Sequence, residues 1–389
     1  MPPRAVVKWL LILAIAAALL GAAVFFAVAP REVDAALNQI VPHPPYETSA
    51  EARALHRTLR VADLHADTLL WMRDPLRRQK RGHTDIPRLK EGGVRLQVFS
   101  AVTKSPSGQN YESNDADSDT ITGLVVAQRW PVKTWSSLAE RALHQARRLA
   151  GLERRSRGAV RVVRTRGDLE AALAEGALAG LLATEGAHPL EGDLANLDRL
   201  HAAGYRVLGL HHFFDNELGG SLHGLSGAGL VDFGRAVVRA AEKKGMILDL
   251  AHSSERAAWD ALAISERPVI VSHTGLKGHC DSPRNVSDAL LQAVAERGGL
   301  VGVGFWDGAV CEASLESIVA AIVYAVNLLG PAHVALGSDF DGATTTPFDA
   351  AELAALTGAL LDAGLDSEVV RAVMGENAIR FFLENLPAE

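Results

Sequence analysis

The chain has 389 residues, of which 48% are hydrophobic, and it carries a formal net charge of −7. These values describe a globular protein with a large core. The mildly acidic balance, without basic clusters, argues against nucleic acid as a partner. The 14 histidines are more informative, because several of them follow apolar runs.

The N-terminus contains a candidate membrane-spanning helix. Arg4 and Lys8 precede an uncharged apolar run over residues 9–29, and about 20 such residues can cross a bilayer as a helix. The triplet Ala27-Val28-Ala29 resembles a signal-peptidase site, so a cleaved signal peptide is one alternative, and a buried core helix is another. We expect an uncleaved anchor, because Pro30 should hinder cleavage, with Arg4 and Lys8 on the cytoplasmic side.

Residues 31–55 are expected to form a stem between this segment (residues 1–30) and an enzyme-sized domain (residues 56–389). Pro42, Pro44 and Pro45 indicate a stiff, extended connection. No later segment combines the length and the apolar character needed to span a membrane. We therefore predict a single-pass cell-membrane protein whose large domain lies on the exported side, periplasmic or extracellular.

Beyond the stem, short β-type runs alternate with amphipathic helical segments. Eight β-then-α units over about 330 residues predict a TIM-type (β/α)8 barrel with insertions. A doubly wound open sheet is the alternative. The expected strands are residues 60–65, 94–102, 178–184, 205–210, 246–250, 268–272, 299–305 and 333–338.

The longest insertion, residues 103–177, separates the second and third expected strands. Its first part, KSPSGQNYESNDADSD, is polar and rich in turn-forming residues, which predicts a surface loop. A helix of about 30 residues is expected around residues 120–150. The basic stretch ERRSRG that follows is expected to be a solvated face, and contact with anionic lipid headgroups is the alternative.

Residue types that bind metals follow most of the expected strands. His65 and Asp67 are two residues apart at the end of the first strand, so their side chains should face the same way. In a parallel barrel all C-terminal strand ends open on one face, where the active sites of this fold lie. Six strands end in such residues, namely His65 and Asp67, Glu185, His211 and His212, His252, His273, and Asp339 and Asp341.

Taken singly, each of these residues has an ordinary structural explanation, such as a hydrogen-bonded core histidine or a helix N-cap. Their repetition at positions that converge on one cavity favours a metal site, because buried charges must be compensated. Imidazoles and carboxylates without thiolates fit two catalytic zinc ions that share a water. The predicted ligands are His65, Asp67, Glu185, His252 and His273, with Glu185 as the bridge and Asp339 nearby.

The order of motifs points to a known family. The chain contains LHADT, TEGAH, DLAH, RPVIVSH, RNVSD, GVGFW and GSDFDG. Together, over residues 55–385, these resemble the membrane (renal) dipeptidase family, zinc hydrolases of the amidohydrolase superfamily with a TIM-type barrel. The resemblance implies that His65 and Asp67 ligate one zinc, that His252 and His273 ligate the other, and that Glu185 bridges them. Many other members of the superfamily bridge with a carboxylated lysine instead.

The resemblance also implies roles in catalysis and substrate binding. Asp339 matches the carboxylate that takes a proton from the bridging water and passes it to the leaving amine. His212 matches the imidazole that stabilises the oxyanion, although the adjacent His211 is an alternative. Arg284 matches the arginine that holds the terminal carboxylate of the substrate, and its ordinary alternative is a surface salt bridge.

The two cysteines fall in neighbouring loops of the expected barrel. Cys280 follows the sixth strand and Cys311 follows the seventh. Because these loops should meet at the barrel mouth, in a domain exposed to an oxidising compartment, we predict a disulfide between them. Two unpaired buried thiols are the alternative.

We therefore predict a membrane-anchored, zinc-dependent dipeptidase, a metallopeptidase whose zinc-bridging hydroxide attacks the peptide bond of a dipeptide. Recognition of both charged substrate ends should disfavour blocked or longer peptides. A related amidohydrolase acting on N-acyl amino acids or β-lactams is one alternative, and a non-catalytic tethered scaffold is another. The expected partners are the dipeptide and, through the N-terminal helix, the membrane. A homodimer is compatible with the sequence, and no nucleic acid is expected.

Overall fold

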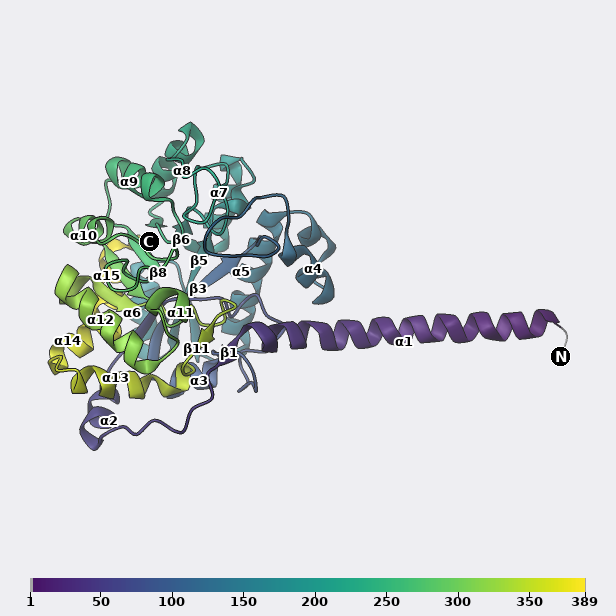
Figure 1. The fold of residues 1–389 in the computed structure, drawn as a ribbon, viewed down its shortest axis with the longest axis horizontal. Coiled ribbons are helices and arrows are strands. Elements are labelled where there is room, and N and C mark those ends of the chain that lie inside the picture. The colour runs from purple at the N-terminus through teal and green to yellow at the C-terminus, as the bar shows by residue number, and fades with distance from the viewer. Residues whose placement is uncertain (1–2, 389) are drawn as a thin grey trace.

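The protein, described over residues 3–388 in a computed structural model, is built around a closed barrel of eight parallel strands (Figure 1). All eight expected strands are present, which confirms the TIM-type (β/α)8 fold. An open sheet is excluded because β3 pairs with β2 on one side and with β5 on the other. The barrel strands are β2 (Val61–Ala66), β3 (Val94–Val102), β5 (Leu178–Glu185), β6 (Tyr205–Gly209), β7 (Ile247–Asp249), β8 (Ile270–Thr274), β9 (Leu300–Val303) and β10 (Val334–Leu336).

The barrel strands are apolar along most of their length because both of their faces are covered. Every residue of β5, for example, is buried. One apolar cluster draws side chains such as Leu64, Leu96 and Leu181 from the barrel strands and is joined by Phe381 and Phe382 near the C-terminus. A second, larger cluster packs the surrounding helices against the strands.

Helices connect the strands and form an outer layer (Figure 1). Many of these helices begin at a residue whose side chain caps the first turn. At the start of α9, for example, the hydroxyl of Ser254 accepts a hydrogen bond from the N–H of Ala257. The helices are α1 (Pro3–Leu37), α2 (Ala50–His56), α3 (Ile86–Glu91), α4 (Thr120–Ala127), η1 (Val132–Trp135), α5 (Leu138–Arg155), α6 (Arg166–Glu175), η2 (His188–Leu190), α7 (Leu194–Ala203), α8 (Asp232–Lys243), α9 (Glu255–Ile264), α10 (Asp288–Glu296), α11 (Asp307–Val310), α12 (Leu315–Leu329), η3 (Pro331–His333), η4 (Ala350–Glu352), α13 (Leu353–Asp362), α14 (Ser367–Arg371), η5 (Ala372–Glu376) and α15 (Asn377–Asn385).

The insertion between β3 and β5 differs from the sequence prediction. The prediction of a single long helix around residues 120–150 is wrong, because this segment forms α4, η1 and α5. Arg129 has a left-handed backbone conformation with φ of 56°, and Pro131 disfavours a helical conformation at the residue before it. In addition, β4 (Val160–Val163), which the sequence analysis missed, pairs with the first half of β5.

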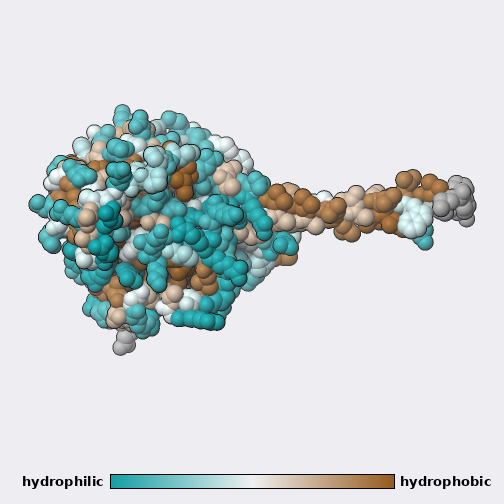
Figure 2. All heavy atoms as spheres, turned by 90° about the horizontal axis from the view of Figure 1, so that it is seen from below, coloured by the Kyte–Doolittle hydropathy of each residue, from teal (hydrophilic) through white to brown (hydrophobic). Residues whose placement is uncertain are grey.

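Helix α1 projects from the barrel as a long apolar rod (Figures 1 and 2). Residues Val6–Leu37 are long and apolar enough to cross a membrane. The helix passes through Pro30, which lies inside it, so the missing N–H removes one helical hydrogen bond without ending the helix. The first part of the expected stem is therefore helical.

The rest of the stem is attached to the barrel. Asp34 and Asn38 are buried, and β1 (Gln39–Ile40) pairs in parallel with β11 (Thr345–Thr346). An extended segment with three prolines then leads to α2, whose first turn is capped by Ser49. Residues 34–40 thus pack against the segment after β10, and α2 packs against α13, so residues 31–55 do not form a simple extended connection.

The predicted disulfide between Cys280 and Cys311 is confirmed. It joins the loop after β8 to the segment after α11. Asn285 strengthens the same junction, since its side-chain amide donates to the carbonyl oxygens of Cys280 and Ala309 at 2.9 and 2.8 Å. The bond to Ala309 reaches α11, whereas the bond to Cys280 lies within the loop after β8. The loop that contains Arg284 is therefore held to its neighbour by the disulfide and by one hydrogen bond of Asn285.

Candidate metal centre

Glu185, the last residue of β5, lies at the centre of four imidazoles. Its Oε1 atom is 3.2 Å from Nε2 of His252, 3.4 Å from Nε2 of both His273 and His212, and 3.5 Å from Nε2 of His65. All five side chains are buried. They come from five different barrel strands or the loops that follow them, so the histidines and the glutamate meet at one mouth of the barrel.

Two further carboxylates complete this cluster. Oδ2 of Asp67 is 3.6 Å from Nε2 of His65, and Oδ1 of Asp339 is 3.8 Å from the same nitrogen. The candidate ligand atoms form three groups, each within 4.8 Å: His65, Asp67 and Glu185; Glu185, His212 and His252; and His65, His273 and Asp339. The structure thus brings together all five residues predicted as metal ligands, and adds His212 and Asp339 to them.

The cluster fits a metal centre. Ligand atoms bonded to a tetrahedral zinc at about 2.0–2.2 Å lie roughly 3.3–3.6 Å from one another, close to the separations around Glu185. Nε2 of His65, Oδ1 of Asp67 and Oε2 of Glu185 are buried and have no hydrogen-bond partner within residues 3–388. Such atoms are costly to bury unless a cation or a proton compensates them.

Polar contacts behind the imidazoles fix their orientation. Oγ of Ser272 lies 3.2 Å from Nδ1 of His65 and 2.9 Å from Nδ1 of His273. An Nδ1–H that donates to this hydroxyl leaves Nε2 unprotonated and able to bind a cation. Asp249 positions the serine in turn, since its carboxylate accepts the N–H of Ser272 at 2.9 Å. No motif in the sequence indicates this supporting role of Ser272 and Asp249.

Burial and neighbouring charges shift the pKa values of the three carboxylates in this cluster. Burial, and then the charge of Glu185, raise the pKa of Asp67 to about 7. Burial also raises the pKa of Asp339 well above its ordinary value, although His65 opposes the shift. Burial acts to raise the pKa of Glu185 as well, but the neighbouring imidazoles, led by His212, hold it well below its ordinary value. The cluster therefore favours an added positive charge.

The two acids of the DFDG motif have different environments. Asp339 faces the imidazole cluster, whereas Asp341 lies 2.8 Å from Nη2 of Arg73 and accepts a hydrogen bond from Thr84 at 2.6 Å. Burial acts to raise the pKa of Asp341, but Arg73 and His83 lower it to about 2. Asp341 thus belongs to a structural ion pair, which explains one strand-end acid without metal chemistry.

The structure distinguishes the two adjacent histidines after β6. His212 lines the cavity, and its Nε2 points to Glu185 while its Nδ1 lies 3.3 Å from the carbonyl oxygen of Lys104. His211 is turned to Ser253, whose hydroxyl is 3.0 Å from its Nδ1. Of the two, His212 is therefore the residue that a molecule in the cavity would contact.

Arg284 is almost fully buried beside the imidazoles and is not part of a surface salt bridge. Its Nη2 donates to the carbonyl of His273 at 3.0 Å and lies 3.3 Å from Nε2 of His252. Its guanidinium lies over the ring of Trp306, 5.2 Å from the centroid. Nη1 is buried without a hydrogen-bond partner in the described part of the chain. A carboxylate in the cavity would supply that partner.

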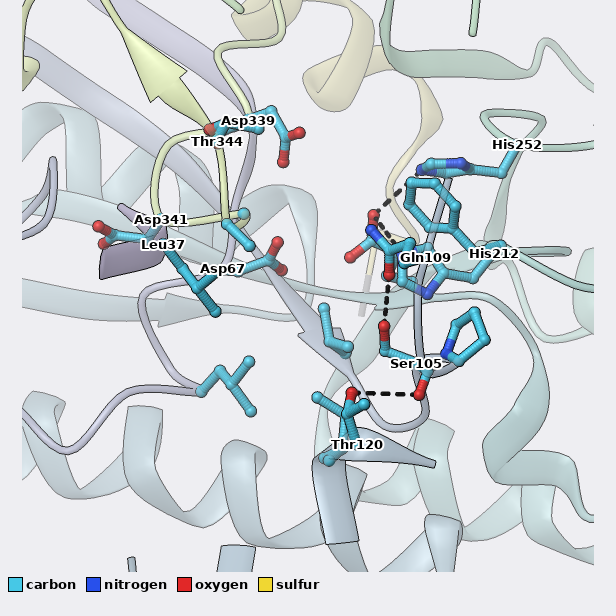
Figure 3. A pocket seen from close by; sticks show the side chains of 18 of the residues that line it. Leu37, Asp67, Ser105, Gln109, Thr120, His212, His252, Asp339, Asp341 and Thr344 are labelled. Carbon is cyan, nitrogen blue, oxygen red and sulfur yellow. Dashed lines mark hydrogen bonds and ion pairs between the residues drawn. The ribbon is translucent and has the colours of Figure 1, made fainter. Parts of the chain in front are cut away.

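A cavity of about 540 Å³ opens in front of the cluster (Figure 3). Some of its lining was not expected from the sequence. Residues 105–111, predicted as a surface loop, contribute Gln109 and Tyr111, and the hydroxyl of Tyr111 accepts a hydrogen bond from Trp306 at 2.9 Å. Val33 and Leu37 at the end of α1 also line the cavity. No local motif marks these residues as cavity residues, although the helical period continues past Pro30.

Comparison with a family model and with a curated protein points to dipeptidases. The sequence model described as membrane dipeptidase (peptidase family M19) matches residues 49–386. Dipeptidase tcpJ of Claviceps purpurea is 30% identical over 321 residues, which cover 78% of this chain and 69% of that protein.

Two solved structures combine moderate identity with the same fold. A metallo peptidase from Rhodobacter sphaeroides, liganded with a phosphinate mimic of the dipeptide L-Ala-D-Ala, is 27% identical, with a TM-score of 0.69 over 85% of this chain and 99% of that chain. Dipeptidase AC, a metallo peptidase of family M19, is 28% identical, with a TM-score of 0.69 over 85% of this chain and 100% of that chain.

Proposed function

Because the chain belongs to the membrane dipeptidase family, peptidase family M19, and is thus a metal-dependent dipeptidase, we propose that it is a membrane-anchored enzyme that uses two zinc ions. His65 and Asp67 would hold one ion, His252 and His273 the other, and Glu185 would contact both. The substrate would be a dipeptide with free ends.

One observation carries this proposal. Four imidazole nitrogens from separate strand ends lie within 3.5 Å of one carboxylate oxygen of Glu185, in a buried cluster that faces a cavity. Neither a core histidine nor a helix cap explains that convergence, because four buried imidazoles and three carboxylates need a compensating charge. The phosphinate dipeptide mimic bound by the Rhodobacter relative supports a dipeptide as the occupant of the corresponding cavity here.

The metal ions would supply Lewis-acid polarisation of the peptide carbonyl and lower the pKa of a water at the site. Asp339 lies at the edge of the imidazole cluster and would accept the proton of the attacking water. As the C–N bond breaks, the same carboxyl group would return that proton to the leaving amine, so that it ends the cycle unprotonated.

Two cationic or hydrogen-bonding side chains would position the substrate. Nη1 of Arg284, which is buried without a partner among residues 3–388, would bind the terminal carboxylate. His212 would donate from Nε2 to the oxyanion formed by the peptide carbonyl. When Nδ1–H faces the carbonyl of Lys104, this donation requires the protonated ring. Burial lowers the pKa of His212, although the charge of Glu185 opposes that shift, so the charge of the developing oxyanion would have to stabilise the protonated form.

The test is hydrolysis by the full chain in detergent, with metal content measured on the same preparation. We expect about two zinc ions per chain and turnover of L-Ala-L-Ala or L-Ala-D-Ala. Amidation of the carboxyl end should lower kcat/KM by about 100-fold or more, because Arg284 would then be left without its anion. Faster turnover of N-acyl amino acids or β-lactams would favour the related amidohydrolase, and a metal-free, inactive protein would favour a scaffold.

We also propose that α1 anchors the enzyme in a membrane without being cleaved. Arg4 and Lys8 precede the apolar run, which favours a cytoplasmic N-terminus. The disulfide between Cys280 and Cys311 fits a barrel domain on the oxidising side. Retention of the enzyme in membranes after alkaline carbonate washing, with the barrel open to protease added outside the cytoplasm, is the expected result. Release with a new N-terminus at Pro30 would show cleavage instead.

A further inference from the structure

The cavity has two chemically different halves. One half contains Glu185, His212, His252 and Arg284, whereas the other is apolar and formed by Leu70, Ile121, Leu124, Val33 and Leu37. The last two belong to α1. A dipeptide with two small residues would fill only part of a cavity of about 540 Å³, so the apolar half can hold a side chain of the substrate.

The end of α1 is a fixed wall of this cavity. Asp34 is buried and lies 3.0 Å from Nε of Arg73 and 2.8 Å from Nε of Arg81. One turn later, the side chain of Asn38 accepts the N–H of Ala343 at 2.9 Å. Residues four apart lie on one face of a helix, so the anchoring pair Asp34 and Asn38 sets the direction of the adjacent residues.

Val33 and Leu37 are the corresponding pair on the neighbouring face. They remain 41% and 43% exposed although they line the cavity. Figure 3 shows Leu37 on the same side of the cavity as Asp67 and Asp341, across from His212 and His252. The buried ion pairs of Asp34 hold these two apolar side chains in the wall of the cavity. A ligand in the cavity can therefore cover them.

The position of Arg284 fixes which end of the substrate meets this wall. Arg284 contacts His252 and His273, and His252 lies across the cavity from Leu37 (Figure 3). A dipeptide whose carboxylate is bound by Arg284 therefore directs its amino-terminal residue toward α1.

We propose that Val33 and Leu37, at the end of the membrane helix, form the recognition surface for the side chain of the substrate's amino-terminal residue and select large apolar side chains. This assignment rests on the proposed dipeptidase function. It makes the anchor helix a specificity element as well as an attachment.

The experiment compares variants of the full chain in one detergent or lipid nanodisc. The substrates are Leu-Gly and Phe-Gly, the reversed pair Gly-Leu and Gly-Phe, and Gly-Gly. Leu37→Ala should lower kcat/KM for Leu-Gly and Phe-Gly by roughly tenfold, mostly through KM, and change the other three by less than about twofold. Leu20→Ala is the matched control, since Leu20 lies on the same helix, 67% exposed and outside the cavity.

Two more variants separate recognition from folding. Leu37→Met should restore the preference, because methionine has a similar apolar volume. Leu37→Glu should raise kcat/KM for Lys-Gly relative to Leu-Gly, a switch that loss of structure cannot produce. Should Leu37→Ala not fold, Val33→Ala provides the same comparison.

Equal losses on all five substrates would overturn the proposal, because they indicate a structural role for Leu37. Losses confined to Gly-Leu and Gly-Phe would also overturn it, since the carboxyl-terminal residue would then face α1. Unchanged kinetics in Leu37→Ala and Val33→Ala would do the same. Absence of dipeptide hydrolysis in the parent enzyme would instead reject the proposed function itself, so the two failures are distinguishable.

Discussion

Asp34, one turn before the end of α1, is paired at 3.0 Å with Nε of Arg73, in the loop after the first barrel strand. The same guanidinium lies 2.8 Å from Asp341, two residues beyond Asp339. The side chains of Asp34, Arg73 and Asp341 are all buried. The apolar helix is thereby joined through ion pairs to the loop that contains the proposed catalytic carboxylate.

The substitution Asp34→Asn should destabilise the protein, because it leaves part of the charge of Arg73 buried without compensation. We expect the free energy of unfolding to fall by about 3 kcal/mol, near the lower end for a broken buried pair, since Arg73 keeps Asp341. Denaturant unfolding in detergent measures this. The control is Glu32→Gln on the same helix, an exposed residue. Equal stability of the two variants would contradict the role given to the ion pair.

The substitution Asp339→Asn should reduce kcat by about 10²- to 10⁴-fold, because an amide cannot accept the proton of the attacking water. KM and the metal content should change little. Steady-state kinetics on L-Ala-L-Ala, together with elemental analysis, test this expectation. Asp307→Asn, at an exposed acid at the start of α11, should leave kcat unchanged. If Asp339→Asn also loses metal, Asp339 is a ligand and not a proton carrier.

Removal of metal by a chelator should lower the unfolding temperature, because Asp67, Glu185 and Asp339 then lie close together without a compensating cation. Zinc returned at about 1,000 times its dissociation constant should stabilise the fold by about 4 kcal/mol. Differential scanning fluorimetry with graded zinc measures the effect. In Glu185→Gln we expect most of this stabilisation to disappear. A Glu185→Gln variant that still binds two ions per chain would rule out Glu185 as the bridge.

Loss of the disulfide should destabilise the barrel mouth. The bridge closes a segment with a sequence separation of 31 residues, for which its removal should cost about 3–4 kcal/mol of unfolding free energy. The double variant Cys280→Ala/Cys311→Ala should also show a higher KM for dipeptides, since the loop of Arg284 then loses its covalent link to α11 and keeps the hydrogen bond from Asn285 to Ala309. Unfolding and kinetics of this variant, measured beside the parent protein under reducing and oxidising conditions, provide the test.

His144 should make the fold sensitive to acid. Burial, and then the charges of Arg148 and Arg147, lower the pKa of His144 to about 4, and its ring packs on Trp130 with 4.4 Å between centroids. The unfolded chain, with an ordinary pKa of about 6.5, therefore binds more protons between these two values. The stabilisation by neutral His144 is complete above pH 6.5 and is lost as the pH falls toward 4.

The variant His144→Gln should accordingly lose less thermal stability than the parent between pH 7 and pH 4.5. The control is His279→Gln, in the loop after β8, which should follow the parent. Differential scanning fluorimetry across this pH range measures all three proteins. A parallel decline of the parent and His144→Gln would show that other groups determine the acid sensitivity.

Much of the barrel was predictable because its signals are local. Each strand is a short apolar run between helical segments, and each ligand lies in the last residues of a strand or just after it, as in VADLHAD for His65 and Asp67. The parallel arrangement then brings the strand ends together without further information. The split of the expected long helix also has a local signal, Pro131, which disfavours a helical conformation at the residue before it.

Chain order and residue type alone thus determined the barrel, the apolar helix and the identity of the residues that gather around Glu185. Only the tertiary structure decided that His212 and not His211 faces the cavity, that Asp341 pairs with Arg73, and that Val33 and Leu37 line the site. The reason is that contacts such as Asp34 with Arg73 join segments distant in the chain. Such a contact produces no periodic pattern in the sequence of either segment. In the sequence alone, each of the two residues is indistinguishable from a charged residue on the surface.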